Sequence, residues 1–231
     1  MDSTSRRSVD AHVFVEPEQL AADRPLQLAE ETEHHLRRVL RLRDGAPVSI
    51  TDGVGRWRLA AVNTGSGSFQ IEPTSVVQTE QRGAEVDVAV VTPKGERVDW
   101  LVQKVTELGA DRIVLLEAEH SVVRWKPDRA NKQLQRLQRI ADEACRQSRR
   151  VWRLEVTGPV QAASVLASYV VAEPGGRRIS SGDTSIAIGP EGGWSAAELE
   201  LAAGRVDLGP NILRTETAAV AATTLCVGFE R

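Results

Sequence analysis

The chain has 231 residues, with 29 Lys or Arg against 32 Asp or Glu, which gives a formal net charge of −3 at pH 7. This balance argues against a protein that holds nucleic acid by its overall charge, because Lys and Arg supply most of the affinity for phosphates. The length permits two domains. The two cysteines, Cys145 and Cys226, lie in helical patterns, which excludes a disulfide framework and predicts reduced, packed thiols.

No targeting or membrane segment is evident in the sequence. Arg6-Arg7 is followed by a stretch, 8–19, that is too polar for the apolar part of a twin-arginine signal. No long apolar span occurs. We therefore expect a cytoplasmic protein whose residues 1–10 form a disordered tail. The histidines lack metal-ligand spacing, so we assign no metal to His12, His34, His35 or His120.

Residues 11–73 are typical of a small β-rich domain. A helix is predicted over 30–40, and Asp52-Gly53 marks a turn. Short strands separated by turn residues favour a small barrel. The polar, turn-rich stretch 74–83 is the best candidate for a linker. The predicted strands of this domain are 12–15, 47–51, 57–62 and 69–71.

Residues 84–231 alternate between strand and helix patterns. The near-continuous apolar run 86–91 is typical of a strand covered on both faces. Apolar residues at helical spacing then end at Gly109, a good residue to follow a helix. The alternation predicts an open α/β domain with a mainly parallel sheet. Further strands are predicted at 113–116 and 169–172, and a long amphipathic helix with basic faces includes 134–144.

Basic residues cluster in two parts of the chain, at 37–58 and at 124–150. Arg56-Trp57-Arg58 favours contact with RNA, because a base can stack on an aromatic ring or a guanidinium plane. A structural appendage with solvated arginines is the alternative for the first cluster. For the second cluster, the alternative is a helix face that is simply solvated.

A glycine-rich loop, Gly189–Gly193, follows the predicted strand 185–188. Ser195 and Glu198 then have the spacing of a helix-starting capping box. Glycines let the backbone approach a ligand closely. The loop lacks the Lys-Ser/Thr pair and the spacing of phosphate-binding motifs, and Glu191 would repel a phosphate. A neutral or cationic ligand, contacted by backbone N–H and C=O groups, fits better.

A second loop repeats this design. The predicted strand 206–208 ends in Gly209-Pro210, and the charged turn 214–217 leads into an apolar helix over 218–229. A helix that is apolar on nearly all sides belongs in a core or a subunit interface. In open α/β sheets, ligands lie beyond the carboxyl ends of the strands, so both loops and residues 173–175 are expected to form one pocket. Plain tight connections between strand and helix are the alternative.

These motifs resemble the signature of the RsmE family, SPOUT-class methyltransferases that modify N3 of a uridine in 16S ribosomal RNA. The signature is Gly-Pro-Glu-Gly-Gly-Trp at 189–194 with Glu198, followed by Ile-Leu-Arg-Thr-Glu-Thr-Ala at 212–218. The resemblance covers nearly the whole chain, and the second motif is its most specific part. Further matching segments are 39–41, 52–53, 94–97, 103–109 and 143–150.

The resemblance implies a PUA-like RNA-binding barrel at 11–73 and a methyltransferase domain at 84–231. In that domain a trefoil knot would hold S-adenosylmethionine, and the enzyme would act as a homodimer on 16S rRNA in the small ribosomal subunit. Arg214 would stabilise negative charge on the uracil, and Glu216 would orient that arginine or accept the N3 proton. For Glu216, a structural ion pair at the start of the helix is an equal alternative.

The resemblance also implies two sets of contact residues. The cofactor-binding set is Ala172, Glu173, Ile188, Gly189, Pro190, Glu191, Gly192, Gly193, Leu208, Gly209, Ile212, Leu213, Thr217 and Ala218. The RNA-binding set is Arg37, Arg38, Arg41, Arg56, Arg58, Lys94, Arg97, Arg146, Gln147, Ser148 and Arg150.

Two other functions remain open at this level: a methyltransferase of another RNA, and a non-catalytic RNA-binding or ribosome-assembly protein. A nucleotide-dependent enzyme would need a phosphate cradle or a ribose-binding acid, and neither is evident. The stretch 174–178 is richer in glycine than the family pattern. The first cofactor loop is therefore the weakest of the expected assignments.

Overall fold

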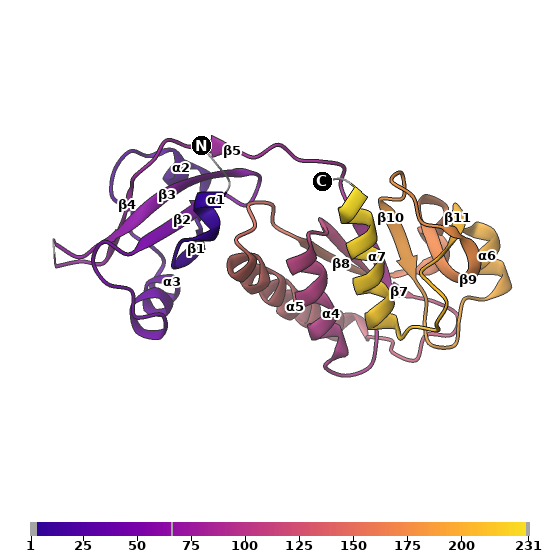
Figure 1. Cartoon of the computed structure of the whole chain (residues 1–231). Helices are drawn as coiled ribbons and strands as arrows, with labels where there is room; N and C mark the ends of the chain where they lie inside the picture. The colour runs from indigo at the N-terminus through magenta and orange to yellow at the C-terminus, as the bar shows by residue number, and fades with distance from the viewer. Residues whose placement is uncertain (1–3, 66, 230–231) are drawn as a thin grey trace. The chain divides into compact units, whose positions relative to one another are not determined.

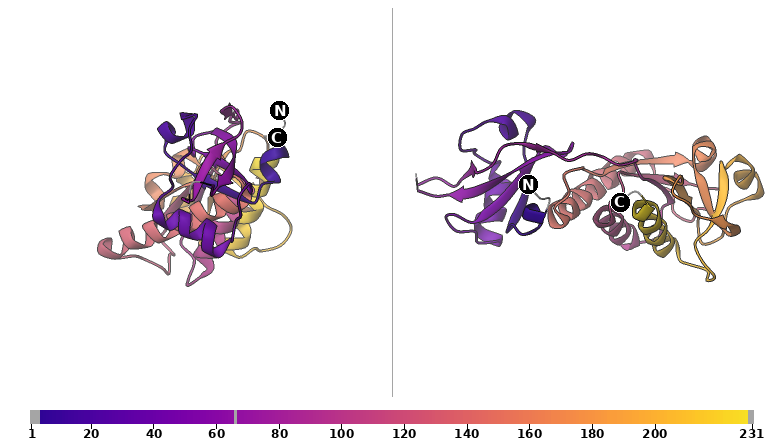
Figure 2. Two further views of the ribbon diagram at one scale, coloured as in Figure 1. Left: turned by 90° about the vertical axis from the view of Figure 1, so that its left-hand side faces the viewer. Right: turned by 45° about the horizontal axis from the view of Figure 1, so that its top comes forward.

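The computed structural model describes residues 4–65 and 67–229 and divides the chain into two compact units (Figures 1 and 2). Unit 1 extends to Arg82 and also includes residues 145–153, whereas unit 2 comprises 83–144 and the chain from Leu154 onward. The sequence pattern places 145–153 in the second domain. They belong to unit 1 because its loop at Gly53–Gly55 exchanges backbone hydrogen bonds with them, from Gly55 N to Val151 O (2.9 Å) and from Arg153 N to Gly53 O (2.8 Å).

Unit 1 contains one five-stranded sheet. The strand order is β1-β2-β3-β4, with β5 paired to β3, and only the β1–β2 pairing is parallel. The predicted strand 47–51 and the predicted helical stretch 30–40 are confirmed. The elements are α1 (Thr4–Arg7), β1 (Ala11–Phe14), α2 (Pro17–Ala21), α3 (Glu30–His34), the π-helical turn η1 (His35–Val39), β2 (Pro47–Thr51), β3 (Arg56–Asn63), β4 (Gln70–Pro73) and β5 (Gln78–Thr79).

The core of unit 1 forms where the sheet meets the short helices. Along β3, Ala60 and Val62 alternate with more exposed residues, as expected for a strand with one covered face. They pack with Ile50 of β2, Ile71 of β4 and Leu36 of η1, all at most 2% exposed. A single apolar cluster therefore fixes the register of these strands, because a slip of one residue would turn the apolar set outward.

The N-terminal segment and the expected linker are more ordered than the sequence suggests. Thr4–Arg7 is helical, and Arg6 is 7% exposed. Its guanidinium lies 2.7 Å from Glu80 and 5.0 Å from the ring centroid of Trp57. The expectation of a tail at 1–10 is therefore wrong for 4–10, and residues 1–3 lie outside the described residues. The expected linker 74–83 likewise contributes β5 and Glu80 to unit 1.

Unit 2 is an α/β domain with a parallel sheet, as predicted. Its six strands are in the order β11-β9-β10-β6-β7-β8, and every neighbouring pair is parallel. The elements are β6 (Asp87–Val91), α4 (Arg97–Leu108), β7 (Arg112–Glu117), α5 (Pro127–Ser148), β8 (Glu155–Gln161), η2 (Ala162–Ser164), η3 (Leu166–Ser168), β9 (Val170–Arg178), β10 (Ser185–Ile188), α6 (Ala196–Leu201), β11 (Gly204–Asp207) and α7 (Thr215–Phe229).

Helices cover the middle strands of unit 2. The last helix, α7, packs beside α4 and against β6 and β10 (Figures 1 and 2). Gly109 ends α4 in the left-handed conformation, at φ 115°, as the sequence predicts. Cys145 and Cys226 are buried thiols outside any disulfide, and burial raises the pKa of Cys226 to about 11. The prediction of packed cysteines is confirmed.

Sequence patterns missed strand β8. The segment contains Gly158-Pro159, and a proline within a run argues against a central strand because it cannot donate to the ladder. β8 is an edge strand, however, and its pairing with β7 shifts register between Val114 and Leu116. An edge position with an irregular ladder accommodates the proline.

Over the described residues, none of the helices is long and apolar enough to cross a bilayer.

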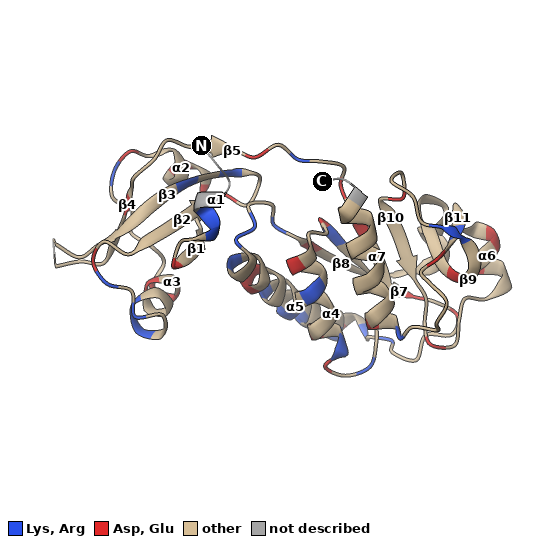
Figure 3. Ribbon diagram, in the orientation of Figure 1, with Lys and Arg blue, Asp and Glu red and all other residues tan. Residues whose placement is uncertain are grey.

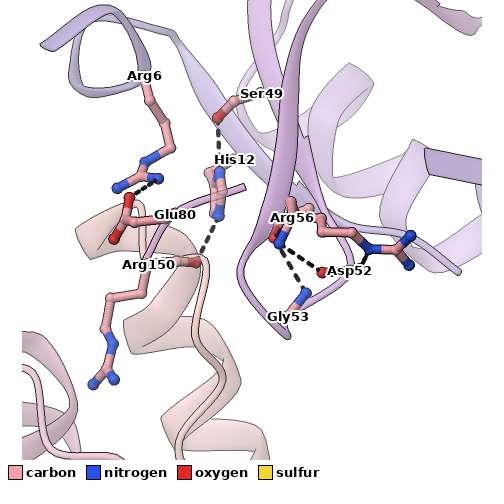
Figure 4. Close-up of polar contacts among 9 residues, drawn as sticks. Arg6, His12, Ser49, Asp52, Gly53, Arg56, Glu80 and Arg150 are labelled. Atoms are coloured by element: carbon pink, nitrogen blue, oxygen red, sulfur yellow. Dashed lines mark hydrogen bonds and ion pairs between the residues drawn. The ribbon is translucent and has the colours of Figure 1, made fainter. Parts of the chain in front are cut away.

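His12 of β1 is a buried titratable group in unit 1, 3% exposed. Its Nε2 lies 2.8 Å from Arg150 O, and because a carbonyl oxygen can only accept, the Nε2–H group is the donor (Figure 4). The other ring nitrogen, Nδ1, therefore carries no hydrogen and accepts from the Ser49 hydroxyl at 2.7 Å. Burial is the main factor that lowers the pKa of His12 from 6.5 to about 3; the hydrogen bond to Arg150 opposes this, and the charges of Arg6 and Arg149 add to it. The imidazole is thus neutral in the folded unit.

We expect unit 1 to lose stability as the pH falls from about 6.5. Between that value and about 3, the unfolded chain protonates His12 and the folded chain does not. The free energy of unfolding should then fall by up to about 1.4 kcal/mol per pH unit. Urea unfolding followed by tryptophan fluorescence tests this between about pH 7 and 5, where most carboxylates stay ionised. His12→Gln should flatten the slope, and an equal slope in the variant would contradict the assignment.

Candidate functional site

A pocket of unit 2 lies where β10 and β11 end, beside the first half of β9. Parallel pairing places Ile188 of β10 beside Ala172 of β9, and brings the end of β11 to the same edge of the sheet. The pocket has a volume of about 440 Å³, within the usual range for small-molecule sites. Its walls are the segments 172–174, 188–194 and 207–213, with Thr215 and Ala218 from the start of α7.

The first wall is a bulge within β9 rather than a loop after it. Pairing with β11 passes from Val171↔Arg205 directly to Arg177↔Val206, so residues 172–176 leave that ladder. Gly176 makes the return possible, because a Cβ there would lie 2.7 Å from the backbone of Val206. The expected end of the strand at 172 is corrected by this finding. The unusual glycine content at 174–178 serves the close approach of β9 and β11.

Asp207, at the end of β11, joins two walls of the pocket. Its Oδ2 accepts the backbone N–H of Gly175, and its Oδ1 accepts that of Gly209, both at 2.9 Å. These two hydrogen bonds, with the Gly209 bond the stronger cause, lower the pKa of the Asp207 carboxyl. The bulge and the second loop are therefore held to each other through one ionised side chain.

The glycine loop 189–193 is enclosed by side chains from three directions. A Cβ on Gly189 would lie 2.9 Å from the indole of Trp194, which is itself 7% exposed. The buried Thr215 hydroxyl donates to Gly189 O at 3.1 Å. On the other side, His120 Nδ1 lies 3.0 Å from Gly193 O, so the ring donates to that carbonyl. The loop backbone is thus fixed in position while its remaining groups line the pocket.

The helix after this loop begins as the sequence predicts. Ser195 Oγ accepts from Glu198 N, and Glu198 Oε2 accepts from Ser195 N at 2.9 Å, which completes the capping box. The other oxygen of Glu198 accepts the N–H of Glu119, which follows β7. The capping carboxylate therefore also attaches α6 to the loop after β7.

Arg97, the first residue of α4, lies between two carboxylates of the site. Its Nη1 donates to Glu191 Oε1 of the glycine loop at 2.9 Å, and its Nε lies 3.8 Å from Glu216 Oε1 on α7. The second contact is too long for a hydrogen bond. Glu216 is 12% exposed, and its Oε2 is buried with no hydrogen-bond partner among the described residues. Arg97 was expected to contact RNA; in this structure it compensates the charge of two carboxylates beside the pocket.

The structure brings together almost all residues of the expected cofactor set. All of them line the pocket except Thr217, which is exposed on α7. Arg214 and Glu216 do not line it, although Thr215 between them does. The cation near Glu216 is Arg97 rather than Arg214, which is exposed and without an ion pair in the described part of the chain. Pro174, Pro210 and Asn211 also line the pocket, as expected for residues 173–175 and for the second loop. The sequence did not mark Trp194, Asp207 or Thr215 as lining residues; Trp194 and Thr215 lie in the recognised motifs, whereas no signal marks Asp207.

The expected RNA-binding residues of the β-rich domain divide into two groups. Arg37, Arg38 and Arg41 are exposed. Arg58 is 5% exposed and donates to Ser75 O, to two further carbonyls and to Asp23. The expectation for Arg58 is therefore wrong, because its guanidinium is buried and its donors are bound within unit 1. Trp57 is 2% exposed, so it is not an open stacking surface, and Arg56 forms an ion pair with Asp52 at 2.6 Å (Figure 4).

The remaining expected RNA contacts lie in both units. Lys94 is exposed in unit 2, in the turn before α4. Arg146, Gln147, Ser148 and Arg150 lie in the segment that joins unit 1. The backbone of that segment is well engaged, since Arg150 O accepts from His12, and Ser148 Oγ lies 3.5 Å from Cys145 O.

Comparison with known proteins adds to this geometry. A family model described as an RNA methyltransferase domain matches residues 80–227, and one described as an RNA methyltransferase PUA domain matches 28–74. Ribosomal RNA small subunit methyltransferase E of Synechocystis sp. is 31% identical over 228 residues, covering 89% of this chain and 73% of that protein. The protein of the same name from Mycobacterium bovis is 31% identical, with 81% and 80% covered.

Solved structures agree with the sequence matches. Ribosomal RNA small subunit methyltransferase E from Neisseria gonorrhoeae, bound to S-adenosyl methionine, superposes with a TM-score of 0.79 at 27% identity, covering 92% of this chain and 94% of that one. A putative methyltransferase from Legionella pneumophila, also with bound cofactor SAM, has a TM-score of 0.78 at 25% identity, with 94% and 96% covered.

The parallel α/β unit with its loop-lined pocket, and the two matching models, define an RNA methyltransferase with a PUA domain. More particularly, the chain belongs to the ribosomal RNA small subunit methyltransferase E family. The family resemblance inferred from the motifs at 189–194 and 212–218 is confirmed.

Proposed function

We propose that this protein transfers a methyl group from S-adenosylmethionine to N3 of a uridine in the 16S ribosomal RNA of the small subunit. The observation that supports this most directly is the pocket at the ends of β10 and β11 and the bulge of β9, which contains residues of the two motifs that mark the family. Two relatives with this architecture were solved with the same cofactor. The names of the similar proteins from Synechocystis and Mycobacterium specify ribosomal RNA of the small subunit, and the uridine N3 is the position that the family resemblance implies.

The residues of the pocket fit S-adenosylmethionine. The volume of about 440 Å³ suits a ligand of this size. Glycines at 189, 192 and 193 leave backbone groups open to a ligand, and no phosphate-binding pattern competes. Glu191 and Glu173 place carboxylates in the wall, which favours a ligand with positive charge over an anion. We assign cofactor contacts to the segments 172–174, 188–193 and 208–213, with Ala218.

Methylation at N3 requires an acceptor for the N3 proton. When bound, the cofactor supplies an electrophilic methyl group, and the electrons of the broken C–S bond stay with its sulfur. We assign the role of proton acceptor to Glu216, which directly follows the pocket residue Thr215 in sequence. Its Oε2 is buried and has no hydrogen-bond partner among the described residues. An unpaired buried acceptor is unfavourable, by about 1–3 kcal/mol, until a donor reaches it. A uridine N3–H is such a donor.

Arg97 is the positioning residue for this carboxylate. It lies 3.8 Å from Glu216 Oε1 and hydrogen-bonds Glu191, so it links the proposed base to the glycine loop. Its side chain is 41% exposed, so the contact with Glu216 can open when substrate arrives. Arg214 has a different role: exposed and without an ion pair in the described residues, it is available to stabilise negative charge on the uracil oxygens.

Replacing Gly189 with alanine should weaken cofactor binding by at least roughly tenfold. The new Cβ would lie 2.9 Å from the indole of Trp194, so either the loop or the ring must move. Calorimetric titration with S-adenosylmethionine measures the effect. Gly182→Ala is the matched control, since its Cβ would meet nothing within 4 Å. Equal affinities in the two variants would refute the placement of the cofactor.

Methyl transfer tests the reaction itself. Small subunits that lack the modification are incubated with labelled S-adenosylmethionine, and their nucleosides are then analysed. We expect 3-methyluridine as the product. Glu216→Gln should lower kcat by a factor of about 10²–10⁴ and Arg214→Ala by a factor of about 10²–10³, both with unchanged affinity for the cofactor. Arg97→Ala should lower kcat with little change in cofactor affinity, and Arg97→Lys should restore part of it because the positive charge returns.

Several outcomes would contradict the proposal. Label on transfer RNA but not on subunits or free 16S rRNA would indicate another RNA substrate. Cofactor binding without transfer to any RNA would favour a ribosome-assembly role. A normal kcat in Glu216→Gln would leave Glu216 only its alternative role, a carboxylate at the start of α7.

We also propose a homodimer. The exposed side of α7 is made of small or apolar residues, among them Leu225 at 36% exposure, and Trp100 on the neighbouring α4 is 45% exposed. Such a surface is typical of a subunit interface. Light scattering that shows a stable monomer would refute this. A ribosomal RNA substrate implies the cytoplasm as the place of action, and the trefoil knot of the family stays a prediction for this chain.

A further inference from the structure

The lining of the pocket at the ends of β10 and β11 is acidic. It contains three carboxylates, Glu173, Glu191 and Asp207, and the described residues that line it include no lysine, arginine or histidine. Figure 3 shows red segments beside β9 in this part of unit 2. Arg177, the basic residue nearest in sequence to the bulge, does not line the pocket and forms an ion pair with Asp183 at 2.6 Å. The wall of the pocket is therefore negatively charged.

Two of these carboxylates have partners and the third has none. Arg97 donates to Glu191 Oε1 at 2.9 Å, and Asp207 accepts two backbone N–H groups, also at 2.9 Å. Glu173 is half-buried in the bulge of β9, and among the described residues its side chain has neither an ion pair nor a hydrogen bond. Withdrawing a carboxylate from water is unfavourable unless a cation or a donor compensates it. Glu173 thus offers an unused negative charge to the ligand that fills the pocket.

The cofactor and the product that it leaves behind differ in charge. S-adenosylmethionine is a sulfonium, with a positive charge on its sulfur. Methyl transfer leaves the electrons of the broken C–S bond on that sulfur, so S-adenosylhomocysteine is a neutral thioether. The amino-acid end is the same in both ligands, and its ammonium and carboxylate charges cancel. The sulfonium is therefore the uncompensated cation of the cofactor, and the reaction removes it.

We propose that Glu173 is a specificity-determining residue whose carboxylate attracts the sulfonium, so that the pocket binds S-adenosylmethionine more tightly than S-adenosylhomocysteine. This rests on the proposed function and adds how the site distinguishes its substrate from its product. Opposite charges attract more strongly in a partly buried site than in water, and a neutral sulfur gains nothing from the attraction. The same wall therefore favours release of the cofactor product once the methyl group has left.

Two other groups of the ligand can meet this carboxylate. A ribose hydroxyl would donate a hydrogen bond to it, and the ammonium of the amino-acid end would form an ion pair with it. Both groups occur in the product as well as in the cofactor, so either contact would raise the affinity for both ligands equally. The described lining contains no cation, so the carboxylate beside that ammonium would be repelled there. The sulfonium is the better match.

Calorimetric titration of the full chain with three ligands tests this. Glu173→Gln keeps the shape of the side chain and removes its charge. The variant should bind S-adenosylmethionine roughly tenfold more weakly and S-adenosylhomocysteine with nearly unchanged affinity. An analogue with a protonated amine in place of the methylsulfonium group should lose affinity as the cofactor does. Both losses should shrink as salt is added, because salt screens the attraction.

The matched control is Glu200→Gln. Glu200 is exposed on α6 and does not line the pocket, so this variant has the same change in net charge with an unchanged wall. Equal loss of cofactor and product affinity in Glu173→Gln would assign the side chain to a shared group, the ribose or the ammonium, and would overturn the proposal. An unchanged ratio of the two affinities, or an equal change of that ratio in the control, would overturn it as well.

Thermal unfolding of the ligand-free protein separates this role from a structural one. Glu173 has no partner to lose among the described residues, and its replacement relieves repulsion from the other carboxylates of the wall. Glu173→Gln should therefore melt at or above the temperature of the unchanged protein. A lower melting temperature with equal loss of both ligands is the result that a structural role predicts, and it would count against the proposal.

Kinetics distinguish this inference from the proposed reaction. In the active enzyme, Glu173→Gln should lower the ratio of the inhibition constant of S-adenosylhomocysteine to the KM of the cofactor by about the same factor as the binding ratio. If the unchanged protein methylates small subunits and the variant keeps its preference for the cofactor, the inference fails and the reaction stands. If no RNA is methylated but the variant loses that preference, the inference stands and the reaction fails. Binding of neither ligand by the unchanged protein would refute both.

Discussion

The parallel pairing of β9 between β10 and β11 is the constraint on which the site depends. It brings the ends of β10 and β11 to one edge, and a bulge in β9 brings residues 172–174 into the same wall. Close contact between β9 and β11 at Gly176 makes the bulge possible, because no side chain fits against the backbone of Val206. Asp207 adds the final link by accepting backbone N–H groups from both sides. The pocket is thus positioned by backbone geometry more than by its own side chains.

Charge in the site is arranged around this rigid wall. Glu191 belongs to the glycine loop and Glu216 to α7, and Arg97 of α4 lies between them. Three elements that meet only in the folded unit therefore share one cation. The bond to Glu191 is a good hydrogen bond, whereas the contact with Glu216 is long, and an unpartnered carboxylate oxygen remains beside it. Buried polar groups are usually paired, so the unpaired oxygen of Glu216 marks a position where a substrate group can bind.

The arginines of unit 1 have two distinct kinds of role. Arg6 and Arg58 are almost fully buried, and their donors satisfy Glu80, Asp23 and backbone carbonyls. Arg37, Arg38 and Arg41 are exposed instead. Residues 145–153 add a further part of this unit from a distant place in the chain, and their carbonyl at Arg150 keeps His12 in one tautomer. A basic residue in the sequence is therefore not by itself a nucleic-acid contact.

The sequence by itself determined the parallel α/β class, the strand at 185–188, the capping box of α6, the glycine end of α4 and nearly all the lining of the pocket. These features depend on local rules: apolar periodicity, helix caps and glycine loops at strand ends. Only the tertiary structure showed that Arg58 is buried, that 145–153 belongs to unit 1, that 172–176 is a bulge, and that Glu216 faces Arg97 instead of Arg214. Each of these depends on contacts between residues far apart in the chain, which local patterns do not encode.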